Sequence, residues 1–154
     1  MISNSSPLIF LSKIGELDIL RKLFVKIKIP SSVKEEVLIE DKIGGEFIKE
    51  AIEEGWIKIE DPKKTLELSL GKGENSVISL GKENKEAIIM DDLKAIKISK
   101  SLGLKYSRTT TIILEGVKRG AINKKQALDR INKLIEEGYY IAPRYFATIY
   151  SKLH

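Results

Sequence analysis

Residues 87–95 read Ala-Ile-Ile-Met-Asp-Asp-Leu-Lys-Ala. Four successive apolar residues are typical of a strand that is covered on both faces, as in the centre of a parallel sheet. Two acidic residues follow, and then a stretch of helical periodicity through Ser101 that Gly103 closes. Glycine often ends a helix because it accepts the left-handed conformation. A buried strand, an acidic turn and a helix in this order predict an α/β fold with a parallel sheet.

The rest of the chain repeats this alternation of strands and helices. Alternating apolar residues predict strands at 25–29 and 56–59, and short apolar runs predict strands at Ile2, 87–90 and 104–107. Residues 61–71 are either an irregular loop or a short edge strand. Without repeats or an evident linker, residues 1–154 are expected to form a single domain. Helical patterns cover 7–13 (with Ser6 as N-cap), 16–23, 31–39, the residues after Gly44-Gly45 to 54, 73–82, 93–101, 109–119, 124–137 and 143–153.

Composition excludes several kinds of site. The chain contains no cysteine, and its one histidine is the last residue, His154. Disulfides, cysteine-ligated zinc sites and histidine-based catalytic triads are therefore excluded. The net charge is +5, and basic residues are frequent between 94 and 125. This excess either helps to attract a polyanion such as RNA or belongs to a solvated lysine and glutamate surface.

The N-terminal residues lack the basic region and long apolar run of a signal peptide. No stretch reaches the roughly 18 apolar residues that a membrane span needs. A cytoplasmic protein without membrane association is the expectation, and the absence of cysteine fits a reducing compartment.

Polar residues follow the predicted strands where ligands bind to parallel sheets, at the carboxyl ends. Asn4 comes after the first strand, and Asp91-Asp92 come after the apolar one. Glu36 and Glu74 lie on predicted helices. Converging carboxylates repel one another, and a hard cation such as Mg²⁺ or Mn²⁺ relieves that repulsion through oxygen ligands. Taken singly, each residue also has a structural explanation, as a helix cap, a favourable charge near a helix N-terminus or a solvated side chain.

Four motifs taken together resemble those of PIN-domain proteins, and most of all the small archaeal and bacterial PIN proteins related to VapC-type toxins. They are Ser-Asn-Ser-Ser-Pro-Leu-Ile (3–9), Ile-Pro-Ser-Ser-Val-Lys-Glu-Glu-Val (29–37), Gly-Lys-Gly-Glu-Asn-Ser-Val-Ile (71–78) and Ile-Ile-Met-Asp-Asp-Leu-Lys-Ala (88–95). The individual motifs are loose, so the specificity lies in their order and spacing. The resemblance runs nearly from end to end, through Gly-Leu-Lys-Tyr-Ser-Arg-Thr at 103–109.

The resemblance implies a three-layer α/β/α fold with a short parallel sheet of four or five strands. It also implies a nuclease that cleaves RNA with Mg²⁺ or Mn²⁺, an antitoxin protein as partner, and a homodimer in many relatives. Glu36, Glu74 and Asp92 match acidic catalytic positions, and Asn4, Glu74, Asp92 and the adjacent Asp91 are candidate metal ligands. Ser6 matches a small hydroxyl position. Thr109 and the basic residues Lys94 and Arg108 complete the candidate pocket.

Asn4 departs from the pattern, because nuclease members usually carry Asp at this position. An amide keeps an oxygen ligand but loses a charge, which lowers affinity for a hard cation. The alternative function is therefore a weakened or inactive PIN domain that binds RNA or a protein. Three other interpretations are weaker: a phosphate loop at 71–76, a helix-turn-helix at 109–137, and base stacking by the C-terminal tyrosines, which are more typical of core or dimer contacts.

Overall fold

The computed structural model describes residues 1–39 and 44–154, and these hold five strands and nine helices. All strands run parallel in the order β3-β2-β1-β4-β5. The expected α/β fold is thus confirmed. The strands are β1 (Ile2–Ser3), β2 (Ile27–Ile29), β3 (Ile57–Ile59), β4 (Ile88–Ile89) and β5 (Tyr106–Ser107). The helices are α1 (Ser5–Lys13), α2 (Asp18–Phe24), α3 (Ser31–Ile39), α4 (Gly45–Glu54), α5 (Lys72–Asn84), α6 (Leu93–Ser101), α7 (Thr109–Lys118), α8 (Lys124–Glu136) and α9 (Pro143–Leu153).

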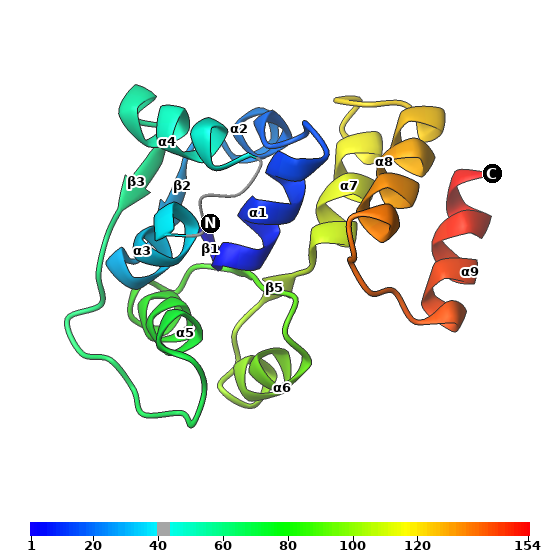
Figure 1. The fold of residues 1–154 in the computed structure, drawn as a ribbon. Coiled ribbons are helices and arrows are strands. Elements are labelled where there is room, and N and C mark those ends of the chain that lie inside the picture. Colours follow the sequence, from blue (N-terminus) through cyan, green and yellow to red (C-terminus); the bar gives the residue numbers. More distant parts are fainter. Residues whose placement is uncertain (40–43) are drawn as a thin grey trace.

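The strand order reverses direction between β1 and β4. From β1 the chain moves outward to β2 and β3, and from β3 it returns to β4 and then β5. Right-handed crossovers place the helices of these two halves on opposite faces of the sheet. Accordingly, α1, α2 and α7 lie on one side of the strands and α5 and α6 on the other (Figure 1). The switch between β1 and β4 is where such sheets bind ligands.

The apolar run at 87–90 forms the buried centre, as expected. Ile88, Ile89 and Met90 are fully buried, and β4 lies between β1 and β5. At the opposite edge, β3 leaves Lys58 and Ile59 exposed. Apolar side chains from both helical layers and the sheet join one core cluster. In the described part of the chain, no helix is both long and apolar enough to cross a membrane.

Several predicted boundaries are wrong. The first helix begins at Ser5 rather than Pro7, with Asn4 instead of Ser6 at the N-cap position. The strand predicted at 25–29 begins only at Ile27, because Val25 adopts a φ of 65° at the end of α2. The strands predicted at 87–90 and 104–107 are reduced to two residues each, Ile88–Ile89 and Tyr106–Ser107. Residues 61–71 form no strand, which leaves the loop interpretation.

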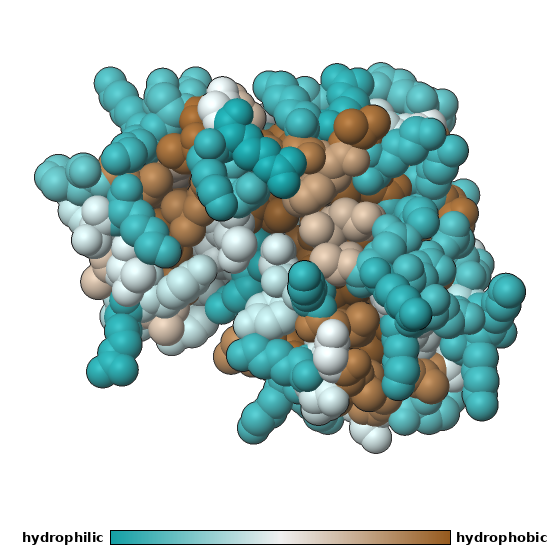
Figure 2. Space-filling model, turned by 180° about the vertical axis from the view of Figure 1, so that it is seen from behind, coloured by the Kyte–Doolittle hydropathy of each residue, from teal (hydrophilic) through white to brown (hydrophobic). Residues whose placement is uncertain are grey.

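The three C-terminal helices extend away from the sheet. In Figure 1, α7 lies beside α1, α8 lies outside α7, and α9 is outermost with the C-terminus at the edge. Ile149 and Leu153 are the buried side chains of α9. Figure 2 views the molecule from behind and shows hydrophilic side chains around most of the outline, with hydrophobic patches between them. Helices α7, α8 and α9 therefore form an additional helical layer that packs against α1 and α2 through α7.

Candidate active site

A cavity of about 430 Å³ lies at the switch point between β1 and β4. Asn4 follows β1 directly, and its backbone N–H donates to the carbonyl of Ile89 in β4 (3.0 Å). The same register brings Asp91 and Asp92, which follow β4, to this end of the sheet. Six of the residues predicted for the site line the cavity: Asn4, Ser6, Glu74, Asp91, Asp92 and Arg108.

Asn4 is buried and does not act as a helix cap. Its side chain makes no capping hydrogen bond to α1. Instead Nδ2 donates to the sulfur of Met90 (3.2 Å), and Oδ1 has no hydrogen-bond partner among the described residues. A buried carbonyl oxygen without a donor costs free energy. Because Asn4 is one of the residues that line the cavity, a cation bound there would give this oxygen the partner that it lacks.

Glu36 does not line the cavity itself but reaches it through Ser5. Ser5 Oγ donates to Glu36 Oε2 (2.6 Å), and Ser5 is one of the lining residues. The glycines of the motif at 71–74 explain how two carboxylates fit here. A Cβ at Gly73 would overlap the Glu36 carboxylate, and one at Gly71 would lie 2.5 Å from Glu74 Oε2. Both positions lack a side chain where acidic groups need the space.

Asp92 and its neighbour Asp91 have different surroundings. Asp92 is exposed at the N-cap of α6, where its Oδ1 accepts from the backbone N–H of Ala95 (2.8 Å). One oxygen of this carboxylate caps α6, and Asp92 is also one of the residues that line the cavity. Asp92 therefore fits both the capping explanation and the ligand explanation at once.

Asp91 is largely occupied by protein donors, a finding that bears on its predicted role as metal ligand. Its Oδ1 accepts from the Thr109 backbone N–H (3.0 Å) and from the Tyr139 hydroxyl (2.5 Å). Its Oδ2 accepts from Thr109 Oγ1 (2.5 Å). Burial, followed by the charge of Asp91, raises the pKa of Tyr139 well above its usual value, so this phenol stays a donor. Asp91 thus ties β4, α7 and the α8–α9 connection together.

The two basic candidates lie differently. Arg108 lines the cavity, with its Nε 3.8 Å from Asp91 Oδ1 and its guanidinium 6.0 Å from the Tyr145 ring centroid. Lys94 is exposed on α6 and donates to the carbonyl of Ser69 (3.0 Å), outside the cavity lining. Thr109 is buried and bonded to Asp91, also outside the lining. Of these candidates, Arg108 is placed to meet a bound anion.

The carboxylate and amide oxygens at the cavity are of the type that binds a hard cation, but the residues that carry them are spread around the cavity. Among residues 1–39 and 44–154, no three acidic or histidine side chains approach closely enough to form a ready-made metal group. Asn4 Oδ1 lacks a partner, and Glu74 and Asp92 line the same space. Oxygen donors of this type are the ligands that Mg²⁺ and Mn²⁺ take.

Sequence reasoning did not single out several lining residues, namely Ser5, Phe10, Leu93, Gly138, Tyr139, Tyr140 and Ala142. Four of these come from the α8–α9 connection, which is remote in sequence from the other motifs. From the sequence, core or dimer contacts are a better interpretation of the C-terminal tyrosines than base stacking. Tyr139 is indeed a buried contact, whereas Tyr140 is exposed at the cavity.

A second hollow, of about 270 Å³, lies between α2 and α4 and is lined by Arg21, Phe47 and Trp56 among others. None of the predicted site residues lines it. The cavity at the switch point is the candidate active site because the predicted oxygen ligands gather there.

Comparisons with known proteins identify the family and the fold of the chain. The family described as "DUF3368: PIN domain" matches residues 1–154. Among solved structures, the chain is similar to a PilT N-terminus domain protein, SSO1118, from the hyperthermophilic archaeon Sulfolobus solfataricus P2. That similarity has a TM-score of 0.56 and 21% sequence identity, and it covers 76% of this chain and 94% of the other. At this identity the match supports the fold. No curated protein matches.

Proposed function

The chain belongs to the PIN-domain family, and from that premise we propose that it is a metal-dependent endoribonuclease. PIN domains are generally a nuclease fold. The observation that carries the proposal is the shared cavity at the switch point. Asn4, whose buried Oδ1 has no hydrogen-bond partner among the described residues, lines this cavity together with Glu74 and Asp92. In this proposal the site takes Mg²⁺ or Mn²⁺, and residues 1–154 act as one catalytic domain.

In this proposal the site residues hold the cation, position a ligand residue or contact the RNA phosphate. Asn4, Glu74 and Asp92 hold the cation, and Glu36 acts through Ser5, whose hydroxyl it accepts from. Arg108 meets the phosphate of the RNA, since this positively charged residue lines the cavity. A divalent cation held there lowers the pKa of a water and neutralises charge that develops at phosphorus. Asp91 is assigned to the wall rather than to the metal.

Calorimetric titration of Mn²⁺ tests the proposal, with Asp92→Asn in parallel. Asn is the matched replacement because it caps helices about as well as Asp, so α6 should keep its start while the charge is lost. We expect the parent to bind Mn²⁺ and to cleave RNA until a chelator is added. The variant should fold like the parent and do neither. Equal cleavage by parent and variant would contradict the proposal.

A second function is favoured by Asn4 itself. The missing charge at this position lowers cation affinity, so an inactive PIN domain that binds RNA or a protein is the alternative. This alternative predicts that a chelator does not change RNA binding. It also predicts that the parent shows no heat of Mn²⁺ binding in the calorimetric titration.

We further propose that the chain is the toxin of a VapC-type pair, on the strength of the four motifs in series. An antitoxin would then cover the cavity. Expression of the chain alone should slow growth of a host cell, and co-expression of a small protein encoded beside it should relieve the effect. Growth that is unaffected by the active chain would contradict the toxin role while leaving the ribonuclease proposal intact.

A further inference from the structure

The α8–α9 connection, residues 137–142, presents an aromatic ring to the candidate active site. Tyr140 is 72% exposed and lines the same cavity as Glu74 and Asp92. Leu93, the first residue of α6, is 66% exposed and also lines it. Large apolar side chains usually lose such exposure in a core, and these two keep it at the rim of a polar cavity. The cavity lining therefore includes two large exposed side chains, Tyr140 and Leu93, besides its carboxylates.

Tyr139 holds Tyr140 in place. The Tyr139 side chain is only 5% exposed, its hydroxyl donates to Asp91 Oδ1, and its ring meets Phe10 edge-on, with centroids 5.2 Å apart. Gly138, with a φ of 93°, allows the turn that precedes this pair. The backbone that carries Tyr140 is thereby fixed to both α1 and the end of β4, although the connection is orange in Figure 1 and far from them in sequence.

A nucleotide matches this arrangement of groups. Its phosphate can meet Arg108 and a cation at the oxygen ligands, while its base meets an exposed ring. A cavity of about 430 Å³ is also within the size range of small-ligand sites. Base stacking requires an unpaired base, since the bases of a duplex are already stacked and their faces are covered.

We propose that Tyr140 stacks on an unpaired nucleobase next to the phosphate in the cavity, so that the site selects single-stranded RNA. The inference rests on the proposed function in taking RNA as the ligand. It assigns Tyr140 a binding role, with no part in the bond that breaks.

Equilibrium binding of a labelled 12-nucleotide RNA tests the proposal by fluorescence anisotropy. The RNA is used as a single strand and as a duplex of the same sequence, in Ca²⁺, and its integrity is checked on a gel after each titration. Tyr140→Ala should weaken single-strand binding by roughly 5- to 150-fold, which is the effect of losing the stacking of one base. Tyr140→Phe should bind like the parent, because the ring remains, and duplex binding should stay unchanged in both.

Tyr150→Ala is the matched control, since Tyr150 is another exposed tyrosine and does not line the cavity. It should bind both RNAs like the parent. Parent-like binding by Tyr140→Ala would overturn the proposal, and so would an equal loss for the duplex. A parent that binds neither RNA would overturn it too, as would a Tyr140→Ala variant whose sole change is the loss of a dimer on size exclusion.

Cleavage in Mn²⁺ separates this proposal from the ribonuclease proposal. If no protein cleaves RNA but single-strand binding depends on the ring, the ribonuclease proposal fails and the stacking role stands. If the parent cleaves and Tyr140→Ala binds equally well, the stacking role alone fails.

Discussion

The two adjacent aspartates at the end of β4 have identical side chains but different surroundings, and we expect them to have different roles. Asp91 accepts three hydrogen bonds from Thr109 and Tyr139, while Asp92 is exposed and caps α6. A carboxylate that satisfies several buried donors matters mainly to stability, because its removal leaves those donors unpaired. A carboxylate that faces a cavity matters mainly to ligands.

Asp91→Asn should therefore destabilise the fold, by roughly 1–3 kcal/mol, since the amide cannot accept on both atoms and Tyr139 and Thr109 would lose charged acceptors. Urea unfolding followed by circular dichroism measures the effect. Asp92→Asn is the control and should unfold within about 0.5 kcal/mol of the parent, because Asn keeps the cap. Equal stability of the two variants would show that the Asp91 contacts carry no weight.

Gly73→Ala should separate stability from ligand binding. The added Cβ displaces the Glu36 carboxylate, which is the far end of a flexible side chain. Alanine favours a helix over glycine by about 1 kcal/mol, so the urea midpoint should stay level or rise. Cleavage or Mn²⁺ affinity should fall, by about 10-fold or more if loss of the Glu36 position costs at least 1.4 kcal/mol.

Gly45→Ala is the control for that substitution. Gly45 begins α4, and the nearest atom to its added Cβ is the Val37 carbonyl oxygen at 3.8 Å, an ordinary contact. It should leave ligand binding unchanged. If Gly73→Ala binds Mn²⁺ and cleaves RNA as well as the parent does, the space beside Glu36 has no functional importance.

At the scale of helices, α7 meets α2 closely at Gly116. A Cβ there would lie 2.6 Å from Ile19 Cδ1 and 3.3 Å from Ile122 Cγ1, and Ile19 is fully buried. Overpacking of this kind costs about 1–3 kcal/mol and exceeds the helix preference for alanine. Gly116→Ala should therefore destabilise by roughly 1–2 kcal/mol in thermal or urea unfolding.

Ile19→Val tests the cause of that loss, because it removes the Cδ1 atom that the new Cβ would meet. The double variant should be more stable than the sum of the two single effects allows. Additive losses would place the cost of Gly116→Ala somewhere other than the contact with α2.

Elements differ in how far the sequence predicts them. The apolar run at 87–90 and the glycine after α6 have local causes, and the structure agrees with both. The lengths of the strands depend on pairing with neighbours, so the expectations at 25–29 and 104–107 were too long. At the site, the motifs identified Asn4, Glu74 and Asp92 as neighbours. The bonds of Asp91 were missed because Tyr139 joins it from 48 residues away, a contact that no local pattern encodes.

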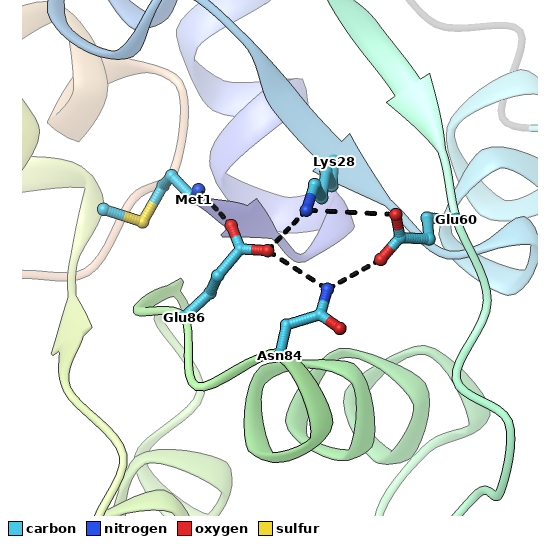
Figure 3. A network of polar contacts seen from close by, with 5 residues as sticks. All are labelled: Met1, Lys28, Glu60, Asn84 and Glu86. Carbon is cyan, nitrogen blue, oxygen red and sulfur yellow. Dashed lines mark hydrogen bonds and ion pairs between the residues drawn. The ribbon is translucent and has the colours of Figure 1, made fainter.

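Across the whole molecule, the end of the sheet opposite the cavity is held by an ionic network. Figure 3 shows Glu86 between the N-terminal ammonium of Met1 and Lys28, with Asn84 and Glu60 completing the group. The Glu86 carboxylate accepts hydrogen bonds from the N-terminal ammonium of Met1 (2.8 Å), from Lys28 Nζ (2.5 Å) and from Asn84 Nδ2 (3.1 Å). Partial burial opposes ionisation, but these donors outweigh it and lower the pKa of Glu86 to about 2. The network joins β1, β2 and the residues before β4.

A lowered pKa in the folded state means that unfolding takes up protons in acid. The contribution of Glu86 is fully present above its ordinary pKa of 4.5 and is lost as the pH falls toward 2. Between pH 5 and pH 2.5, the parent should lose roughly 1–2 kcal/mol more than Glu86→Gln does. Urea midpoints of both proteins at the two pH values provide the measurement. Equal losses of unfolding free energy in the parent and in Glu86→Gln would show that Glu86 does not cause the destabilisation in acid. Other carboxylates would then have to account for it.

The floor and one wall of the cavity come from separate parts of the chain. Asn4, Glu74 and Asp92 follow β1, lie on α5 and cap α6, whereas residues 138–142 connect α8 to α9. Tyr139 fixes this connection through its hydroxyl on Asp91 and its ring on Phe10. On the proposed stacking role of Tyr140, exchange of this residue should change which RNA strands bind while Asn4, Glu74 and Asp92 stay in place. The α8–α9 connection is therefore the segment to exchange between related chains when the proposed preference for single-stranded RNA is to be altered.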